Sequence, residues 1–196
     1  MLPAKQKGFL RMTKLIGISG SLRKASFNTA LLKTAVTLAP EGVTFTSGTI
    51  EGIPLYNADV EREGVPEAVQ LLKDQIAAAD GVILFTPEYN NSIPGVFKNA
   101  IDWVSSSMTG APNVFAGRAF AIAGTSPGPF GTLLSQNAWL SVLRTLGADL
   151  WSGKRLMLPK AGSLFDKDGH LIDEEAKARL KGFVESFAGY VAGKVA

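Results

Sequence analysis

The sequence contains no cysteine and a single histidine, His170. Disulfides, thiolate metal sites and cysteine nucleophiles are therefore excluded, and one imidazole leaves no multi-histidine metal site and makes a Ser/His/Asp triad improbable. The turn at 166–169 is a poor match to a calcium loop, because its glycine comes too early and the later ligands are missing. We predict that the protein binds no metal.

Long apolar runs are also missing, since none approaches the ~18–20 residues needed to span a bilayer. Residues 1–12 lack the apolar core of a secretory signal, so we expect a flexible N-terminal extension before a single domain at 13–196. The net charge of +3 is mild and scattered, which argues against nucleic acid and suits anionic small molecules. We predict a cytoplasmic protein with no membrane span.

What the chain does contain is a regular alternation of short apolar strands and amphipathic helices. The predicted strands are 15–18, 43–50, 82–85, 118–123 and 149–158, and the predicted helices are 28–39, 66–79, 96–106, 132–146 and 173–191. This order predicts a parallel sheet covered by helices on both faces. Ligands of such sheets bind beyond the carboxyl ends of the strands. Polar loops follow three strands there, at 20–28, 87–95 and 124–131, and we expect them to converge on one site.

The helical spacing also predicts which side chains face the core. In the last helix these are Ala176, Leu180, Phe183, Val184, Phe187 and Val191. In the helix at 132–146 they are Leu133, Leu134, Ala138, Val142 and Leu146. Trp103 and Met108 lie outside the core stripe of the helix at 96–106, so that helix is a candidate interface, but Trp103 is equally well explained as a core residue.

The first loop, residues 20–28, carries more donors than a helix start requires. Its amides and the first helical N–H groups lack backbone partners, and the helix dipole favours negative charge there. Ser21, Ser26 and Asn28 add neutral donors, and the guanidinium of Arg23 suits phosphate oxygens. We interpret the loop as the cradle of a phosphomonoester. The alternative is an ordinary polar loop in which Ser26 or Asn28 only caps the next helix.

Two common nucleotide motifs are missing: the sequence has neither G-x-x-x-x-G-K-[ST] nor G-x-G-x-x-G. Hydroxyls and one arginine in the first loop suit a terminal phosphate better than a bridging pyrophosphate. The second loop offers an aromatic ring, an amide and backbone N–H groups between Pro87 and Asn90, which suits a planar heterocycle. Glu88 is equally well explained as a solvated charge, and Tyr89 as an apolar residue at the rim.

The segment Gly20-Ser21-Leu22-Arg23 with Ser26 and Asn28, and the segment Pro87-Glu88-Tyr89-Asn90 followed by Pro94-Gly95, together resemble the NADPH-dependent FMN reductase family. That family includes bacterial chromate and quinone reductases and flavin-dependent azoreductases. The resemblance implies a flavodoxin-like three-layer α/β/α sandwich, with a five-stranded parallel sheet in the order 2-1-3-4-5 and FMN at the switch point.

The resemblance also implies roles for ten residues. Those assigned to the FMN phosphate are Ser21, Arg23, Ser26 and Asn28. Those assigned to the flanks of the isoalloxazine ring are Pro87, Glu88, Tyr89 and Asn90, and those assigned to its far end are Thr125 and Ser126. No side chain is assigned as catalytic, because the cofactor carries the chemistry.

The implied reaction is a ping-pong hydride transfer from the co-substrate NAD(P)H to N5 of FMN, and then to a quinone, an azo compound, chromate or free flavin. Members of the family form dimers or tetramers, so a homodimer or homotetramer is implied. Two other functions stay open at this point. One is a non-enzymatic FMN electron carrier of the flavodoxin type, and the other is a phosphate-binding module without flavin.

Overall fold

The computed structural model describes residues 11–106 and 112–195 of the chain. Its strands are β1 (Thr13–Ser19), β2 (Val43–Gly48), β3 (Gly81–Phe85), β4 (Ala119–Thr125), β5 (Asp149–Leu150) and β6 (Leu156–Leu158). They form one parallel sheet in the order β2-β1-β3-β4-β5, with β6 also paired to β4. The predicted strand order and flavodoxin-like topology are therefore confirmed.

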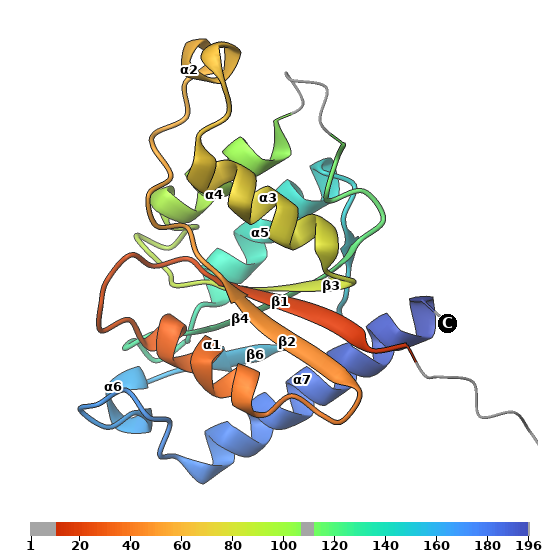
Figure 1. The fold of residues 1–196 in the computed structure, drawn as a ribbon. Coiled ribbons are helices and arrows are strands. Elements are labelled where there is room, and N and C mark those ends of the chain that lie inside the picture. The colour runs from red at the N-terminus through yellow and green to blue at the C-terminus, as the bar shows by residue number, and fades with distance from the viewer. Residues whose placement is uncertain (1–10, 107–111, 196) are drawn as a thin grey trace, which may run out of the picture.

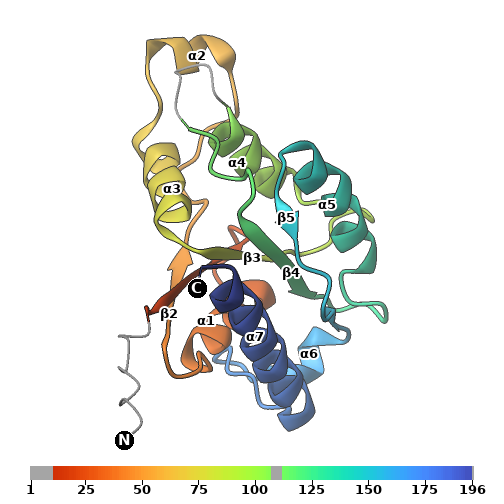
Figure 2. The same ribbon diagram turned by 90° about the vertical axis from the view of Figure 1, so that its right-hand side faces the viewer.

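The helices lie in layers on both faces of this sheet (Figures 1 and 2). One face is covered by α1 (Phe27–Thr37) and α7 (Glu174–Val195), and the other by α3 (Glu67–Ala78), α4 (Gly95–Ser105) and α5 (Leu133–Thr145). Two short helices lie outside these layers, α2 (Ala58–Glu63) and α6 (Ala161–Leu164). The two faces give the three-layer sandwich that the alternation predicts.

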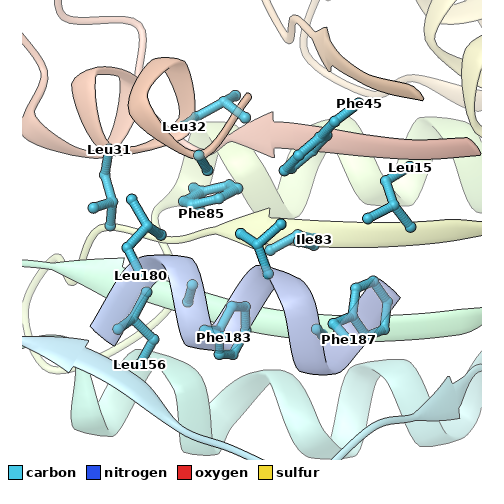
Figure 3. Close-up of a cluster of buried hydrophobic side chains, with 14 of the residues drawn as sticks. Leu15, Leu31, Leu32, Phe45, Ile83, Phe85, Leu156, Leu180, Phe183 and Phe187 are labelled. Carbon is cyan, nitrogen blue, oxygen red and sulfur yellow. The ribbon is translucent and has the colours of Figure 1, made fainter. Parts of the chain in front are cut away.

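The core on the α1 and α7 side shows why the sheet is buried. Strands β3 and β4 are buried at every position, as expected of parallel strands covered on both faces. Figure 3 shows side chains of β1, β3 and α1 facing the aromatic rings of α7, Phe183 and Phe187. All six residues predicted to face inward from the last helix are buried.

The predicted strand 149–158 is wrong as a single element. It divides into β5, which pairs with β4 at Ala119 and Phe120, and β6, which pairs with β4 at 123–125. The exposed residues between them, Ser152-Gly153-Lys154-Arg155, leave the sheet. Two of them are charged and one is glycine, so they would be poorly placed in a covered strand.

The predicted inward face of α5 is also wrong at its start. Leu133 and Leu134 are 40% and 44% exposed. The buried side chains of α5 are Ser135, Gln136, Trp139 and Leu143. Hydrogen bonds decide this orientation, because Ser135 and Trp139 both bond the buried hydroxyl of Thr86 below the helix.

Trp103 belongs to the core, where it is 1% exposed, and its Nε1 donates to the carbonyl of Pro54 at 2.8 Å. The core alternative is therefore confirmed for Trp103, whereas Met108 lies outside the described residues. Residues 1–10 of the predicted extension also lie outside them, and Arg11 forms an ion pair with Asp80 at 2.6 Å. No helix in the described ranges combines the length and the apolar character needed to cross a membrane.

Candidate functional site

The three polar loops start side by side at the carboxyl edge of the sheet. Ser19 pairs with Phe85, and Phe85 pairs with Ala123, so β1 and β3 end at the same level and β4 continues for two more residues. Two hydrogen bonds extend this alignment into the loops: Gly20 N donates to Phe85 O at 2.9 Å, and Thr86 N donates to Ala123 O at 2.8 Å. The structure thus brings the three predicted loops together.

Two positions at this edge require glycine, because neighbouring atoms leave no room for a side chain. A Cβ on Gly20 would lie 2.1 Å from the ring of Phe97, and a Cβ on Gly124 would lie 2.3 Å from the backbone oxygen of Thr86. Both contacts are far below van der Waals distance, so any larger residue would push the loops apart. The glycines therefore set how tightly the loops pack against α4 and β3.

The first loop has more free donors than helix capping explains. Ser26 is the N-cap of α1, and its Oγ accepts from Thr29 N at 3.3 Å, so the capping role of Ser26 is confirmed. Within the described part of the chain, further backbone N–H groups have no acceptor, and they belong to Leu22, Lys24, Ala25, Phe27 and Asn28. An anion at the N-terminus of α1 would find these groups available.

Asn28 acts across the sheet rather than as a cap. Its Nδ2 donates to Thr125 O at 2.9 Å, and its Oδ1 accepts from Thr125 N at 3.0 Å. The side chain is 4% exposed and both of its polar ends are engaged. Asn28 therefore fastens the first loop to the start of the third, which sequence reasoning missed, and its own backbone N–H stays free for a ligand.

Arg23 is held by an aromatic ring and not by a carboxylate. Its guanidinium carbon lies 5.4 Å from the centroid of the Phe27 ring, a cation–π arrangement. Among the residues that the structure describes, Arg23 forms no ion pair, so its charge is available to an anion. Ser21 lies next to it, and its Oγ accepts from Arg23 N at 3.3 Å while keeping its own proton to donate.

A hollow of about 630 Å³ lies beside this loop, between α1 and residues 162–169. At its edge, Asp166 Oδ1 accepts from the backbone N–H groups of His170 and Asp168, and Oδ2 lies 3.0 Å from His170 Nδ1. The backbone and side-chain hydrogen bonds from His170 hold the pKa of Asp166 below its usual range. The hydrogen bonds of the Asp166 carboxylate therefore stabilise the turn at residues 166–170.

The second loop contains a rigid two-residue hairpin. Tyr89 and Ser92 exchange backbone hydrogen bonds at 3.1 and 3.0 Å. Asn90 and Asn91 between them have φ of 50° and 60°, the left-handed pair that a type I′ turn requires and that asparagine tolerates well. Tyr89 is 46% exposed, so its ring stands at the edge of the site.

Glu88 has a role that neither of its two interpretations included. Its Oε2 accepts from Leu134 N at 2.8 Å and from Ser135 N at 3.0 Å, so it caps the N-terminus of α5 from another loop. The N-cap residue itself, Thr132, makes no side-chain capping bond. The negative charge also suits the positive end of the helix dipole. Glu88 therefore joins the second and third loops.

A buried threonine, Thr86, also connects the second loop to α5. The Thr86 hydroxyl lies 2.8 Å from Ser135 Oγ and accepts from Trp139 Nε1 at 3.0 Å. It is fully buried. Sequence reasoning missed this residue, although a hydroxyl directly after an apolar strand was a visible signal.

The third loop uses its two predicted hydroxyls internally. Thr125 is 1% exposed, and its Oγ1 donates to Leu158 O at 2.9 Å. Ser126 Oγ donates to Gly131 O. Both residues lie at the shared edge of the sheet, but their hydroxyl protons hold β4 to β6 and shape the loop.

The donor set fits a phosphorylated planar ligand such as FMN. It combines free backbone amides, hydroxyls and one unpaired arginine at the start of α1, with a rigid aromatic hairpin alongside. Among the ten predicted residues the only carboxylate is Glu88, and it is engaged by α5. The arrangement is suited to holding a ligand that brings its own chemistry.

Comparison with known proteins agrees with this geometry. Residues 13–162 match the sequence model described as NADPH-dependent FMN reductase. The chain is 43% identical over 168 residues to an NAD(P)H-dependent FMN reductase of Pseudomonas aeruginosa, covering 86% of this chain and 89% of that protein. It is 36% identical over 178 residues to a 2-hydroxy-1,4-benzoquinone reductase of a Burkholderia species, covering 91% and 96%.

A solved structure is also similar to this chain in fold and in sequence. The flavoenzyme NAD(P)H:(acceptor) oxidoreductase FerB of Paracoccus denitrificans superposes with a TM-score of 0.81 at 35% identity. The match covers 91% of this chain and 97% of that one.

Proposed function

Since this chain belongs to the NADPH-dependent FMN reductase family and is an FMN-dependent oxidoreductase that uses NAD(P)H, we propose that it passes electrons from NAD(P)H to quinones. The choice of quinones rests on relatives such as the Burkholderia benzoquinone reductase. We include azo compounds, chromate and free flavin in the proposal as further acceptors. The electron-carrier alternative is not favoured, because these similar proteins are named as reductases or as an oxidoreductase.

The observation that carries the proposal is the set of unpaired donors at the start of α1. The free N–H groups of Leu22, Lys24, Ala25, Phe27 and Asn28 and the guanidinium of Arg23 would hold the phosphate of FMN. The dipole of α1 favours the same negative charge. The hydroxyls of Ser21 and Ser26 would add neutral donors. When bound, FMN supplies the capacity to accept a hydride and to release electrons to a second substrate.

The other two loops would place the flavin ring. Pro87, the Tyr89–Ser92 hairpin and the backbone at Thr125 and Ser126 form stiff walls, because Glu88, Asn28 and Thr86 tie them together. Stiff walls keep a ring in one orientation without ordering cost at each turnover. No side chain of this chain is needed as a general acid or base.

We also propose that the chain is a cytoplasmic protein with a single domain at 13–196 that acts on small molecules. It would assemble as a homodimer or homotetramer. Exposed leucines on α5 support this assembly.

Anaerobic reduction tests the proposed function directly. NADPH or NADH is added to the FMN-loaded protein, and the flavin absorbance is followed; we expect bleaching within turnover time and recovery when a benzoquinone is added. Dithionite serves as the control that the bound flavin is reducible. A flavin that stays oxidised with both nucleotides would refute the proposal, and protein that fails to bind FMN would favour a phosphate-binding module.

A further inference from the structure

The hollow beside the first loop carries an excess of positive charge. Its walls are the start of α1 and residues 162–169, and Figure 1 shows α6 next to that end of α1. Four basic side chains and two acidic ones line it, so its net charge is +2. The four bases are Arg23, Lys24, Lys33 and Lys167. A hollow of this sign attracts an anion.

Two of these bases, Lys24 and Lys33, have no acidic partner. Both side chains are exposed, and neither forms an ion pair within residues 11–106 and 112–195. The two acids of the hollow are engaged elsewhere. Asp168 forms an ion pair with Lys167 at 3.1 Å, and Asp166 accepts the hydrogen bonds of its own turn. The ammonium groups of Lys24 and Lys33 are therefore available to a ligand.

One wall of the same hollow is aromatic. The ring centroids of Phe27 and Phe165 lie 5.5 Å apart, with their planes tilted by 33°. The residues that face this wall are small, among them Ala30, Gly162 and Gly169. They leave a volume of about 630 Å³, which is enough for a nucleoside phosphate. A planar base can pack against such rings while its phosphate meets the lysines.

FMN alone does not account for this hollow. Its single phosphate is provided for by Arg23 and the free N–H groups of the first loop. Lys33 lies seven residues after the capping residue Ser26, which places its Cα about 10 Å further along α1. The hollow therefore extends beyond the flavin phosphate, and it offers a second phosphate site together with an aromatic wall.

The reductant of the proposed function has the matching groups. NADPH carries an adenine ring, and unlike NADH it also carries a phosphate on the adenosine ribose, with a charge of about −1.5 to −2 at neutral pH. We propose that the hollow binds this adenosine 2′-phosphate, with the phosphate between Lys24 and Lys33 and the adenine against the Phe27–Phe165 wall. Since Ser26 belongs to both the first loop and the hollow, the two sites are continuous. The chain therefore selects NADPH over NADH.

This inference rests on the proposed function, and calorimetric titration tests it without any turnover. The FMN-loaded protein is titrated with 2′,5′-ADP and with 5′-AMP, which differs only by lacking the 2′-phosphate. We expect 2′,5′-ADP to bind about tenfold or more tightly than 5′-AMP. Lys33→Ala and Lys24→Ala should each weaken 2′,5′-ADP by about tenfold and change 5′-AMP by less than about twofold.

Steady-state kinetics should show the same selectivity. Lys33→Ala should raise the KM for NADPH by about tenfold, with kcat and the KM for NADH unchanged. The matched control is Lys181→Ala, which removes an exposed lysine of α7 outside the hollow and should change neither nucleotide. Flavin fluorescence quenching should give the same FMN affinity for Lys33→Ala and the wild type.

Three results would overturn the inference. They are equal affinity of the wild type for 2′,5′-ADP and 5′-AMP, an equal rise of both KM values in Lys33→Ala, and a loss of FMN affinity in that variant as large as its loss of 2′,5′-ADP affinity. Each leaves the proposed function standing if the flavin is still bleached. A flavin that stays oxidised with both nucleotides would instead refute the proposed function, while the titrations still judge the hollow.

Discussion

The side chain of Asn28 pairs with the backbone of Thr125, a residue 97 positions away, through hydrogen bonds of 2.9 and 3.0 Å in opposite directions. This pair fixes the spacing between the N-terminus of α1 and the end of β4. Both partners are buried, so neither polar group of Thr125 has access to water.

Replacement of Asn28 by alanine should therefore be costly. It leaves a buried N–H and a buried C=O without partners, and we expect the free energy of unfolding to fall by about 2–4 kcal/mol. Urea denaturation measures this change. The comparison is Ser26→Ala, which removes only a helix cap and should cost about 1 kcal/mol. An Asn28→Ala protein as stable as Ser26→Ala would contradict the role of Asn28 as a tie between loops.

Glu88 should contribute to stability whether or not a flavin is bound. Glu88→Ala removes the cap of α5, and we expect a loss of about 0.5–2 kcal/mol in the unfolding free energy of the apoprotein. Glu88→Gln keeps an acceptor oxygen but loses the charge, so its loss should be smaller. Thermal and urea unfolding of the three apoproteins checks the order. Equal stability of all three would show that the two hydrogen bonds from α5 to Glu88 do not contribute to the free energy of unfolding.

Arg23 should discriminate between FMN and riboflavin. If its guanidinium meets the phosphate, Arg23→Ala should weaken FMN binding by about 1–3 kcal/mol and leave riboflavin binding nearly unchanged. Quenching of flavin fluorescence on titration with apoprotein measures both affinities. Lys24→Ala provides a matched loss of charge in the same loop and should have a smaller effect. An equal loss for both ligands would place Arg23 away from the phosphate.

Asp149 should shape the acid side of the stability curve. Partial burial raises its pKa, but the hydrogen bonds from Lys194 and Tyr190 outweigh this and hold the pKa below the usual range. A lowered folded-state pKa contributes stability above the unfolded value of about 3.9, and this contribution is lost as the pH falls through the folded value.

Asp149→Asn should therefore lower stability near neutral pH and flatten its loss below about pH 4, the ordinary aspartate pKa. Urea unfolding between neutral and acidic pH compares it with Asp74→Asn, an exposed aspartate on α3 whose curve should follow the wild type. The same hydrogen bond raises the pKa of Tyr190, so its contribution is lost as the pH rises above about 10. Parallel curves for Asp149→Asn and the wild type would show that the cluster carries no pH-dependent stability.

Much of the fold followed from the chain because periodicity and burial are local properties. The sequence alone predicted a parallel sheet covered on both faces. The signals were the apolar runs of β3 and β4 and the helical spacing of Phe183 and Phe187, all of which are buried. The donors at 20–28 and the residues at 87–90 marked two loops of the site. Parallel strands in register then required these loops to share one edge.

Tertiary structure alone decided how those loops are joined. The bonds from Asn28 to Thr125, from Glu88 to the start of α5, and from Thr86 to Trp139 connect segments far apart in the chain. The orientation of α5 followed from these contacts, so Leu133 and Leu134 face outward although their spacing predicted the core. A residue pattern records which side chains are apolar, but only packed neighbours determine which buried donor meets which acceptor, and that pairing set the rotation of the helix.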